Sequence, residues 1–546
     1  MKSWIRGARG AVFVSTLAAL ACTGPLGPIG PQGDQGTPGP AGPKGDPGEP
    51  AVDPSWSAVD KALFSLGGRT PVTGLGTFEI TADGKRFMSL EGWHPDDDSV
   101  QISNFNRRVR YDVSGQKVRI DYSRQILFFG ASTTFTVRIN GNLAHLEGSE
   151  SVFGAPGGDL LSDRMAAIRR QERLLNPHLI LKDVIATPAM ARSVGYQVLD
   201  GSLHHLLEVD DPVYDLTLYV NANTGRIAKL TTKENDHVES DSLLEVYYSG
   251  WDQWSGTVLF PRTVVISLGG KIVHVEERTA VTVNGTLDPA IYNFPTGAAP
   301  TYVQADAERG ARNHQFHECF AGLGIPLDGQ QTLIMPVQVA QGVTLLGGGS
   351  HHTLAIEQDN RIILVEAPLY EARANAILTW VANTYPTKSV SHVIVTHHHR
   401  DHVGGLRRFV RAGATIVVGE ESAEFFAGTF RASRTVEPDA LSASPVAANI
   451  QAVTLGTPVG LTDTNRPVVV HRINQGHAAD FSVAYLPTQR VLFNSDLYSP
   501  NLPANPVYGL QLKQAVEGLG LTVDTMAGGH GVGTSTYAQF LTAIGQ

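Results

Sequence analysis

A dense cluster of metal-binding side chains follows a short apolar run in the C-terminal half of the chain. The β-branched residues 393–395 have the pattern of a buried strand that ends at a polar loop. The loop has the pattern H-x-H-x-D-H, and its possible ligands are His397, His399, Asp401 and His402. Imidazole and carboxylate groups suit zinc, and also iron or manganese. Ligands at i and i+2 can converge on one ion, and the Asp-His pair can turn to a second ion. The fold must therefore bring further ligands to the end of this strand.

Three further candidate ligands lie downstream. His477 follows Gln475 and Gly476, Asp496 follows the strand-like run 490–495, and His530 lies among the glycines of residues 528–531. Each is beside small residues or at a strand end, where a side chain can point into a shared site. Seven candidate ligands in one order are hard to explain as ordinary surface residues. The sequence therefore predicts a metal site in the C-terminal part of the chain.

This order of ligands resembles that of the metallo-β-lactamase superfamily, from about residue 331 to residue 546. Residues 364–368, 396–399, 401–406 and 414–417 are similar to a closer subgroup, for which we have no defined substrate. The resemblance implies an α/β fold, namely the αββα sandwich of that superfamily. The usual size of that sandwich fits residues 331–546, which we predict to be the hydrolase domain.

The resemblance also implies a role for each ligand. His397, His399 and His477 would bind one metal ion, Asp401, His402 and His530 would bind a second, and Asp496 would bridge the two. The implied cofactors are two divalent ions, zinc by preference. A water held between them loses its proton near neutral pH, and the resulting hydroxide attacks a carbonyl or phosphoryl centre. Asp401 would also neutralise charge beside this nucleophile, so we predict it to be catalytic.

Ligand identity narrows the expected reaction. Asp496 argues against a true β-lactamase, and His399 argues against the flavodiiron oxygen reductases, which carry Glu there. We therefore expect an exported hydrolase that cleaves an ester, lactone or thioester, with a phosphodiester or amide as lesser options. One alternative is an iron-dependent oxidoreductase similar to the persulfide dioxygenases, although His402 favours two metals. A second alternative is a non-enzymatic surface protein that binds an apolar ligand.

The sequence departs from the family pattern at two places. Glu366 stands where many members carry Asp, at a position that helps to hold the metal loop. Val418 and Gly419 replace a Thr-His pair expected in the closer subgroup. Both changes leave the seven ligands intact and weaken any inference about the substrate.

Residues 56–298 have the pattern of a mainly antiparallel β domain. Alternating runs at 118–122, 136–139, 216–220 and 272–275 predict strands, and turn signals include residues 83–84, 140–141 and 269–270. One helix is predicted over about residues 160–175, capped by Asp159 and ended by Asn176 and Pro177. Residues 214–261 resemble the lipoprotein-carrier and lipoprotein-sorting proteins, which implies a groove for an apolar group. The alternative is a module that only spaces or docks the catalytic domain. Residues 299–330 are predicted to be a linker.

Several other histidines are not expected to bind metal. The pairs at residues 204–205 and 351–352 are on strand-like segments, where we expect partly exposed side chains. His398 would point away from the metals. The remaining group, which we expect in an irregular connection and do not favour as a second metal site, is His314, His317 and Cys319.

The N-terminal residues carry a targeting pattern and a repeat. Residues 1–21 have a basic start and a short apolar stretch, which predict a signal peptide. The segment before Cys22 resembles a bacterial lipobox, so we expect Cys22 to be lipidated and the protein to be anchored in the cell envelope. Residues 22–55 include glycine at every third position from 24 to 48, a collagen-like period. This segment is either an extended spacer of roughly 80 Å or a stalk that makes a homotrimer.

Composition excludes some partners. The formal charge is −10 and no stripe of lysine and arginine is present, so we expect a small-molecule substrate and no nucleic acid. No apolar run reaches the length of a membrane-spanning helix. If Cys22 is acylated, Cys319 is the only free thiol and no intramolecular disulfide can form.

Overall fold

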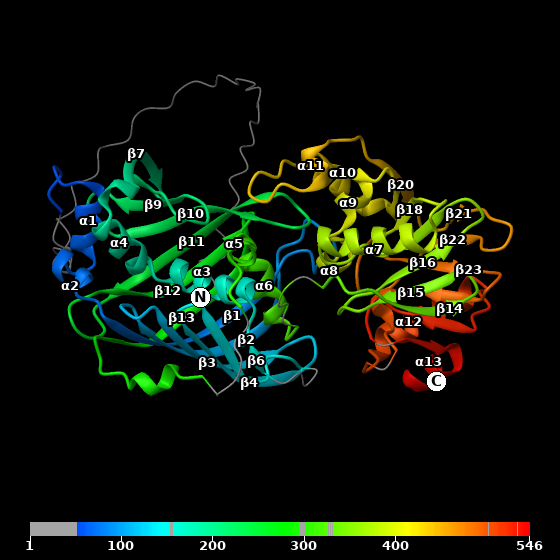
Figure 1. Cartoon of the computed structure of the whole chain (residues 1–546), viewed down its shortest axis with the longest axis horizontal. Helices are drawn as coiled ribbons and strands as arrows, with labels where there is room; N and C mark the ends of the chain where they lie inside the picture. The colour runs from blue at the N-terminus through cyan, green and yellow to red at the C-terminus, as the bar shows by residue number, and fades with distance from the viewer. Residues whose placement is uncertain are drawn as a thin grey trace, which may run out of the picture. The chain divides into compact units, whose positions relative to one another are not determined.

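An antiparallel sheet dominates the first half of the chain and a pair of facing sheets dominates the second half (Figure 1). The computed structural model describes residues 52–152, 157–294, 301–325, 327, 329, 331–500, 502–531 and 533–546. These residues belong to one unit, residues 50–546. The predicted signal peptide, Cys22 and nearly all of the collagen-like segment lie outside the described residues. Within the described ranges, no helix has the length and apolar character needed to cross a membrane.

The first sheet has 13 strands, in the order β6-β5-β4-β3-β2-β1-β13-β12-β11-β10-β9-β8-β7. Consecutive strands pair as antiparallel neighbours except for β6 and β7, which form the two edges, and β1 pairs with β13, which joins the early strands to the late ones. This sheet confirms the antiparallel β domain predicted before the catalytic domain. The strands are β1 (Thr77–Met88), β2 (Val100–Asp112), β3 (Lys117–Ile126), β4 (Ala131–Asn140), β5 (Leu143–Gly148), β6 (Gly158–Asp159), β7 (Ala191–Leu199), β8 (Ser202–Val209), β9 (Leu216–Asn221), β10 (Ile227–Asn235), β11 (Asp241–Asp252), β12 (Phe260–Leu268) and β13 (Lys271–Val283).

Two of the three named turn signals are correct. Gly141 and Gly269 adopt positive φ angles, 56° and 57°, at the hairpins β4–β5 and β12–β13. Gly84 is different, because it lies inside β1. A Cβ atom there would lie 2.2 Å from the ring of Phe105 and 2.5 Å from the carbonyl oxygen of Val275. This glycine therefore permits close packing and does not make a turn.

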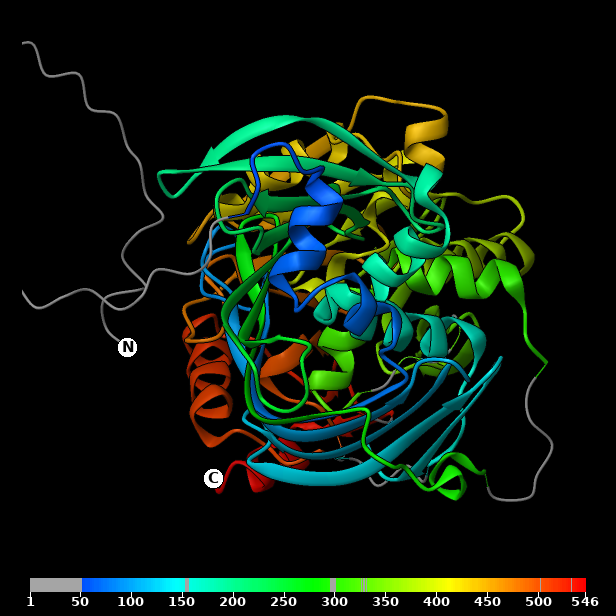
Figure 2. The same ribbon diagram turned by 90° about the vertical axis from the view of Figure 1, so that its left-hand side faces the viewer.

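The helices of this half exceed the single one predicted. The predicted helix is present as α3 (Ser162–Leu175) and ends at Asn176, but α4 (Pro177–Ala186) follows at once. Asp159 does not cap α3, since it belongs to β6 and contacts His145. The predicted linker contains α5 (Gln304–Arg312) and α6 (His314–Gly322), which pack against α3. The first helices are α1 (Ala58–Ser65) and α2 (Arg69–Thr73). Figure 2 shows the strands curving around the central helices.

Buried ion pairs join α3 to the sheet. Arg107 of β2 contacts Glu172 of α3 and lies 2.6 Å from Glu276 of β13, and the three side chains are at most 1% exposed. Arg170 of α3 lies 2.7 Å from Asp211, which is also buried. Charged pairs at this depth need each other, because an isolated buried charge is costly. The apolar groove implied by the lipoprotein-carrier resemblance stays a prediction.

Two facing sheets form the centre of the second half. The 7-stranded sheet has the order β14 to β20, with β17 to β20 parallel, and the 6-stranded sheet has the order β21 to β26. The first contains β14 (Met335–Ala340), β15 (Val343–Gly347), β16 (Thr353–Glu357), β17 (Ile362–Val365), β18 (Val390–Ile394), β19 (Thr415–Gly419) and β20 (Asn449–Val453). The second contains β21 (Val459–Leu461), β22 (Val468–Arg472), β23 (Ser482–Leu486), β24 (Val491–Phe493), β25 (Thr525–Ala527) and β26 (Thr534–Thr536).

Apolar clusters hold four layers together. One cluster fills the space between the sheets, with Ile363, Val365 and Ile394 facing Val470 and Phe493. Further clusters cover the outer face of each sheet with helices (Figure 1). The helices are α7 (Glu371–Thr384), α8 (Arg400–Val403), α9 (Leu406–Arg411), α10 (Ala423–Arg431) and α11 (Ala440–Ala443) beside the first sheet, and α12 (Pro506–Gly518) and α13 (Tyr537–Ala543) beside the second. The expected αββα arrangement is confirmed.

We predict that Arg107→Ala lowers the free energy of unfolding by about 3–5 kcal/mol, because it leaves Glu172 buried without its cation. Arg108→Ala on the same strand is the matched control, since Arg108 is 52% exposed and pairs with Glu79 at the surface. Loss of that pair should cost less than about 1 kcal/mol. Denaturant unfolding followed by circular dichroism measures both changes, and equal losses would show that burial of the pair is unimportant.

Candidate metal centre

The candidate ligands of the H-x-H-x-D-H motif lie at the end of a parallel strand. Strand β18 pairs with β17 and β19, and the chain leaves it through residues 395 and 396. His397 and His399 follow in the loop, while Asp401 and His402 lie on the short helix α8. The β-branched residues of β18 are buried on both faces, so the polar loop can begin only where the sheet ends. The predicted strand and loop are therefore present.

The other three candidate ligands come from the facing sheet. His477 lies between β22 and β23, Asp496 on a 3-10 turn after β24, and His530 directly after β25. Strands β24 and β25 are parallel neighbours, so their carboxyl ends meet at the same edge. The structure therefore brings all seven predicted residues together where the two sheets end.

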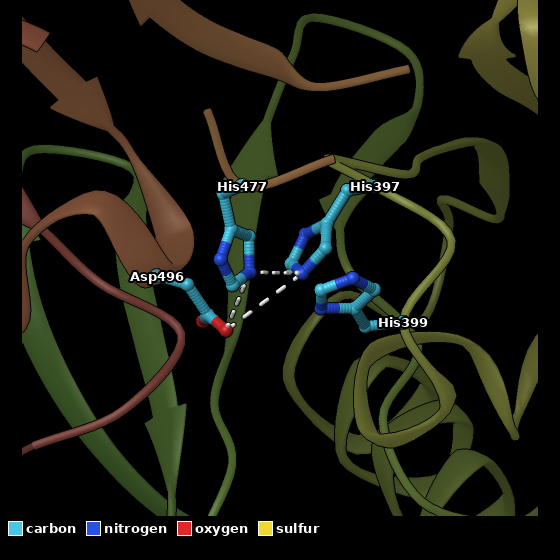
Figure 3. Close-up of side chains that lie close together, drawn as sticks. All are labelled: His397, His399, His477 and Asp496. Atoms are coloured by element: carbon cyan, nitrogen blue, oxygen red, sulfur yellow. Dashed lines mark hydrogen bonds and ion pairs between the residues drawn. The ribbon is translucent and has the colours of Figure 1, made fainter. Parts of the chain in front are cut away.

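The first group of side chains is formed by three histidines and one aspartate. Ligand atoms of His397, His399, His477 and Asp496 all lie within 4.8 Å of one another. The Nε2 atoms of His397 and His477 are 3.3 Å apart, and Asp496 Oδ2 lies 3.7 Å and 3.4 Å from them. Figure 3 shows the rings turned toward a common point that the carboxylate also faces.

The second group shares Asp496 with the first. Its other members are Asp401, His402 and His530, again with all ligand atoms within 4.8 Å. Asp496 Oδ1 lies 3.1 Å from His402 Nε2 and 3.2 Å from His530 Nε2. One carboxylate thus presents Oδ2 to the first group and Oδ1 to the second, which is the arrangement of a bridging ligand.

The donor atoms fit metal ions. Ligands bound tetrahedrally at 2.0–2.1 Å lie about 3.4 Å from each other, and the separations given above are 3.1–3.7 Å. Asp401 Oδ1 is buried and makes no hydrogen bond with any described residue. A buried carboxylate oxygen without a donor is unfavourable unless a cation or a water molecule occupies the space beside it. Number and identity of the ions remain predictions.

The ring nitrogens that face away from the cluster have oxygen partners, as is usual for metal-binding histidines. His397 Nδ1 lies 3.0 Å from Thr396 Oγ1, and His530 Nδ1 lies 3.3 Å from the Ser350 carbonyl oxygen. His399 Nε2 can donate to the carbonyl oxygen of Gly92 at 3.2 Å. These contacts leave Nε2 of His397 and His530 and Nδ1 of His399 facing the cluster.

Glu366, the departure from the expected Asp, holds two parts of the site. Its Oε2 lies 2.9 Å from His402 Nδ1, while Oε1 accepts hydrogen bonds from Thr396 and Ser495. The residue has a positive φ of 70°, a strained conformation for a non-glycine residue. Gly529 lies close by, and a Cβ atom there would be 3.0 Å from Glu366 Oε2. The longer acid therefore reaches the ligand loop where a glycine leaves room for it.

The charges of the cluster shift its pKa values strongly. Burial lowers the pKa of His397 and His399 well below the usual value, and neighbouring histidines add to the effect. Burial also opposes the charge of His402 and His530, but carboxylates overcome it. Asp401, Asp496 and Glu366 raise the pKa of His402 well above its usual value. Asp496 and Asp401 raise the pKa of His530 to about 10. Protons on these two rings therefore balance the carboxylates when no other cation does.

His351 is a member of the site that the sequence analysis missed. We expected partly exposed side chains for residues 351–352, but His351 is fully buried and His352 is 6% exposed. His351 Nε2 lies 2.8 Å from Asp401 Oδ2, and Ser350 Oγ lies 2.7 Å from the other ring nitrogen. Burial lowers the pKa of His351 to about 4, so the ring is neutral and can donate to Asp401. The only sequence feature that could have indicated a role for His351 is the glycine-rich stretch of residues 347–349 just before the histidine pair.

Glu91 is a second residue that the sequence analysis missed. It belongs to the connection between β1 and β2, and its Oε2 lies 3.8 Å from His399 Nδ1. Burial raises the pKa of Glu91 well above its usual value, and the negative charge of Asp401 adds to this. A cation held by Asp401 and its neighbours would oppose both effects and favour the ionised form of Glu91. No local pattern could reveal Glu91 as part of the site, because its segment lies far from the metal motif in the sequence. The next residue, Gly92, is 307 positions before its partner His399.

The other histidines have different partners. His398 Nδ1 lies 2.8 Å from Asp480, a buried carboxylate. His204 and His205 are 3% and 8% exposed, so the expectation of exposure was wrong for them as well. The group at residues 314–319 lies on α6 and not in an irregular connection. His314 contacts Glu234 at 2.6 Å, and His317 contacts the Leu327 carbonyl oxygen at 2.7 Å.

We predict that zinc binding at pH 7 releases about two protons, from His402 and His530. Both pKa values are raised without a cation, so both rings are protonated at pH 7 and must lose that proton to become ligands. Affinity should therefore rise with pH below the pKa of about 10 for His530. Titration calorimetry in two buffers of different ionisation enthalpy counts the protons. Binding without proton release would contradict the assignment of these two ligands.

Comparisons with known proteins agree with this geometry. Residues 346–526 match the family model described as the Metallo-beta-lactamase superfamily. This range contains six of the seven predicted ligands, and His530 lies just beyond it. No curated protein matches the chain significantly.

Solved structures also match the chain over part of its length. A metallo-beta-lactamase from Pontibacter korlensis is 18% identical, with 39% of this chain and 97% of that chain covered and a TM-score of 0.31. TMB-1 is 14% identical, with 39% and 95% covered and a TM-score of 0.30. The metallo-beta-lactamase FIM-1 from Pseudomonas aeruginosa, in a mono-zinc form, is 16% identical, with 39% and 93% covered and a TM-score of 0.30.

The family match and the four-layer arrangement of the two sheets lead to one conclusion. The C-terminal part of this chain, which includes the matched residues 346–526, is a domain with the fold of the metallo-β-lactamase superfamily.

Proposed function

We propose that the chain is a binuclear zinc hydrolase that cleaves an ester, lactone or thioester of a small molecule. The observation that carries this proposal is the position of Asp496 between two complete groups of ligands. Two divalent ions held there would lower the pKa of a water molecule and polarise the oxygen of the scissile bond. The ligands of the first ion would be His397, His399 and His477, and those of the second Asp401, His402 and His530.

The protein's own side chains supply orientation and proton transfer. His351 donates to Asp401 Oδ2 and so fixes the plane of that carboxylate. Asp401 Oδ1 is buried without a hydrogen bond to any described residue, so it is free to accept a proton from the attacking water. Water then adds to the carbonyl carbon, the bond to the leaving oxygen or sulfur breaks, and the leaving group takes up a proton.

Asp496 also favours these bonds over a β-lactam, since true β-lactamases of this fold lack that carboxylate. The iron-dependent oxidoreductase alternative needs one occupied site. The closeness of Asp401, His402 and His530 favours two ions instead, because His530 Nε2 lies 3.4 Å from Asp401 Oδ2.

We also propose that the protein is exported and anchored through Cys22, with the collagen-like segment as spacer or trimer stalk. The charge and repeat pattern of residues 1–48 supports this part of the proposal.

We predict about two zinc ions per purified chain and hydrolysis of at least one member of a panel of small esters, lactones, thioesters and phosphodiesters. Inductively coupled plasma mass spectrometry counts the metal, and product formation names the bond. One iron per chain without hydrolysis would support the oxidoreductase instead. A chain without metal would exclude both reactions.

We predict that Asp401→Ala and His399→Ala each lower kcat/KM by at least about a hundredfold, because each removes a ligand. The matched control is His392→Gln on β18. His392 is a neighbouring histidine whose Nδ1 lies 2.9 Å from Ser391 Oγ, outside both ligand groups. Its kcat/KM should stay within about twofold of the parent value. Full activity of the Asp401 or His399 variant would show that the site is assigned wrongly.

A further inference from the structure

A short segment of the β-rich domain, residues 89–94, lies against the metal centre. It connects β1 with β2, and three of its residues contact the segments that carry the ligands. The Gly92 carbonyl oxygen faces His399 Nε2 at 3.2 Å, and the Trp93 carbonyl oxygen accepts a hydrogen bond from the Ala479 amide at 2.7 Å. Ser89 Oγ accepts one from Arg400 at 2.5 Å. The β-rich domain is therefore part of the site.

Arg400 fastens this contact from the side of the motif. It stands between His399 and Asp401 in the sequence, and its side chain is 6% exposed. One guanidinium nitrogen lies 2.6 Å from Asp236, a carboxylate that follows β10 and is 2% exposed. A buried, directional pair of this kind fixes the separation of the two chain segments. The position of residues 89–94 relative to the ligands is thus determined by a strong interaction.

Glu91 is the charged residue of this segment. Its side chain is 10% exposed, and Oε2 lies 3.8 Å from His399 Nδ1, the nitrogen that faces the first group of ligands. Its Oε1 is buried and makes no hydrogen bond with a described residue. A carboxylate in this position needs a donor or a cation that the described residues do not supply.

Glu366 shows what a purely structural acid does at the same site. Its Oε1 accepts hydrogen bonds from Thr396 and Ser495, and its Oε2 forms an ion pair with His402 Nδ1 at 2.9 Å. Glu91 has no such set. It also belongs to neither of the two groups that share Asp496, whose ligand atoms lie within 4.8 Å of one another. Its place is beside the first group, with Oε2 at 3.8 Å from His399 Nδ1.

We propose that Glu91 is a specificity-determining residue, supplied by the β-rich domain to the active site of the hydrolase domain. It favours substrates that present an ammonium group beside the scissile bond. It disfavours substrates that present a carboxylate there, because two like charges meet in a site with little solvent. The inference rests on the metal centre of the proposed function and adds the charge class of the substrate.

The experiment compares the full chain with Glu91→Gln and with the control Asp98→Asn. Gln keeps the shape of Glu91 and removes its charge. Asp98 is an exposed acid of the same connection, so its variant makes the same change in net charge away from the ligands. Each protein is loaded with cobalt, and three thiols of similar size are titrated while the absorption of the metal is followed: cysteamine, 2-mercaptoethanol and mercaptoacetate.

We expect the parent chain to bind cysteamine more tightly than mercaptoacetate. Glu91→Gln should change the ratio of these two Kd values by about tenfold or more in favour of mercaptoacetate. The Kd of neutral 2-mercaptoethanol should change by less than about threefold, and Asp98→Asn should leave the ratio within about twofold. Matched ammonium and carboxylate esters should show the same shift in kcat/KM.

Two results would overturn the inference. An unchanged ratio in Glu91→Gln would show that the side chain does not face the ligand. If Glu91→Gln bound one cobalt ion fewer per chain than the parent, Glu91 would be a metal ligand instead of a specificity residue. A shifted thiol ratio without hydrolysis of any ester would disprove the proposed reaction and leave Glu91 in its role. Hydrolysis with an unchanged thiol ratio would support the proposed reaction and disprove the role of Glu91. A chain that binds no cobalt would disprove both proposals.

Discussion

The carboxylate of Asp496 is the point on which the C-terminal domain converges. Its two oxygens face two groups of side chains that come from opposite sheets, at 3.1–3.7 Å from the nearest nitrogens. So many buried imidazole and carboxylate groups are unfavourable without cations, because burial penalises each charge. When no metal ion is bound, only protons can neutralise the carboxylates, and the pKa values of His402 and His530 are raised for this reason. Cations that bind at this edge would therefore also stabilise its fold.

The β-rich domain has a direct part in that site. Arg400 lies inside the ligand motif but forms its ion pair with Asp236, outside the hydrolase domain. The Gly92 carbonyl oxygen orients His399, a task that metal sites usually give to a neighbouring backbone or carboxylate group. A domain that served only as a spacer would not need these contacts. The buried ion pairs around α3, such as Arg107 with Glu276, hold the sheet that carries this segment.

Sequence patterns succeeded where the relevant interactions are local. The helix predicted over about residues 160–175 is present as Ser162–Leu175, and the apolar run before the metal motif belongs to the end of a strand, Val390–Ile394, because apolar periodicity determines both. The predictions failed where a distant partner decides. Asp159 pairs with His145 and does not cap a helix, and the expected linker folds into α5 and α6 because α3 offers a surface for them. His351 looked like a strand residue until the fold placed it against Asp401.

The sequence by itself determined the types and order of the candidate ligands, since strand ends and metal-binding residues are written in short motifs. The αββα fold followed from the family resemblance that these motifs carry. It also determined the repeat and the charge pattern of the N-terminal residues. Only the tertiary structure decided that Asp496 faces both groups, that His351 holds Asp401 and that Glu91 enters the site. These are contacts between segments far apart in the chain. Their geometry depends on how two sheets and a separate domain pack, and no local pattern records that packing.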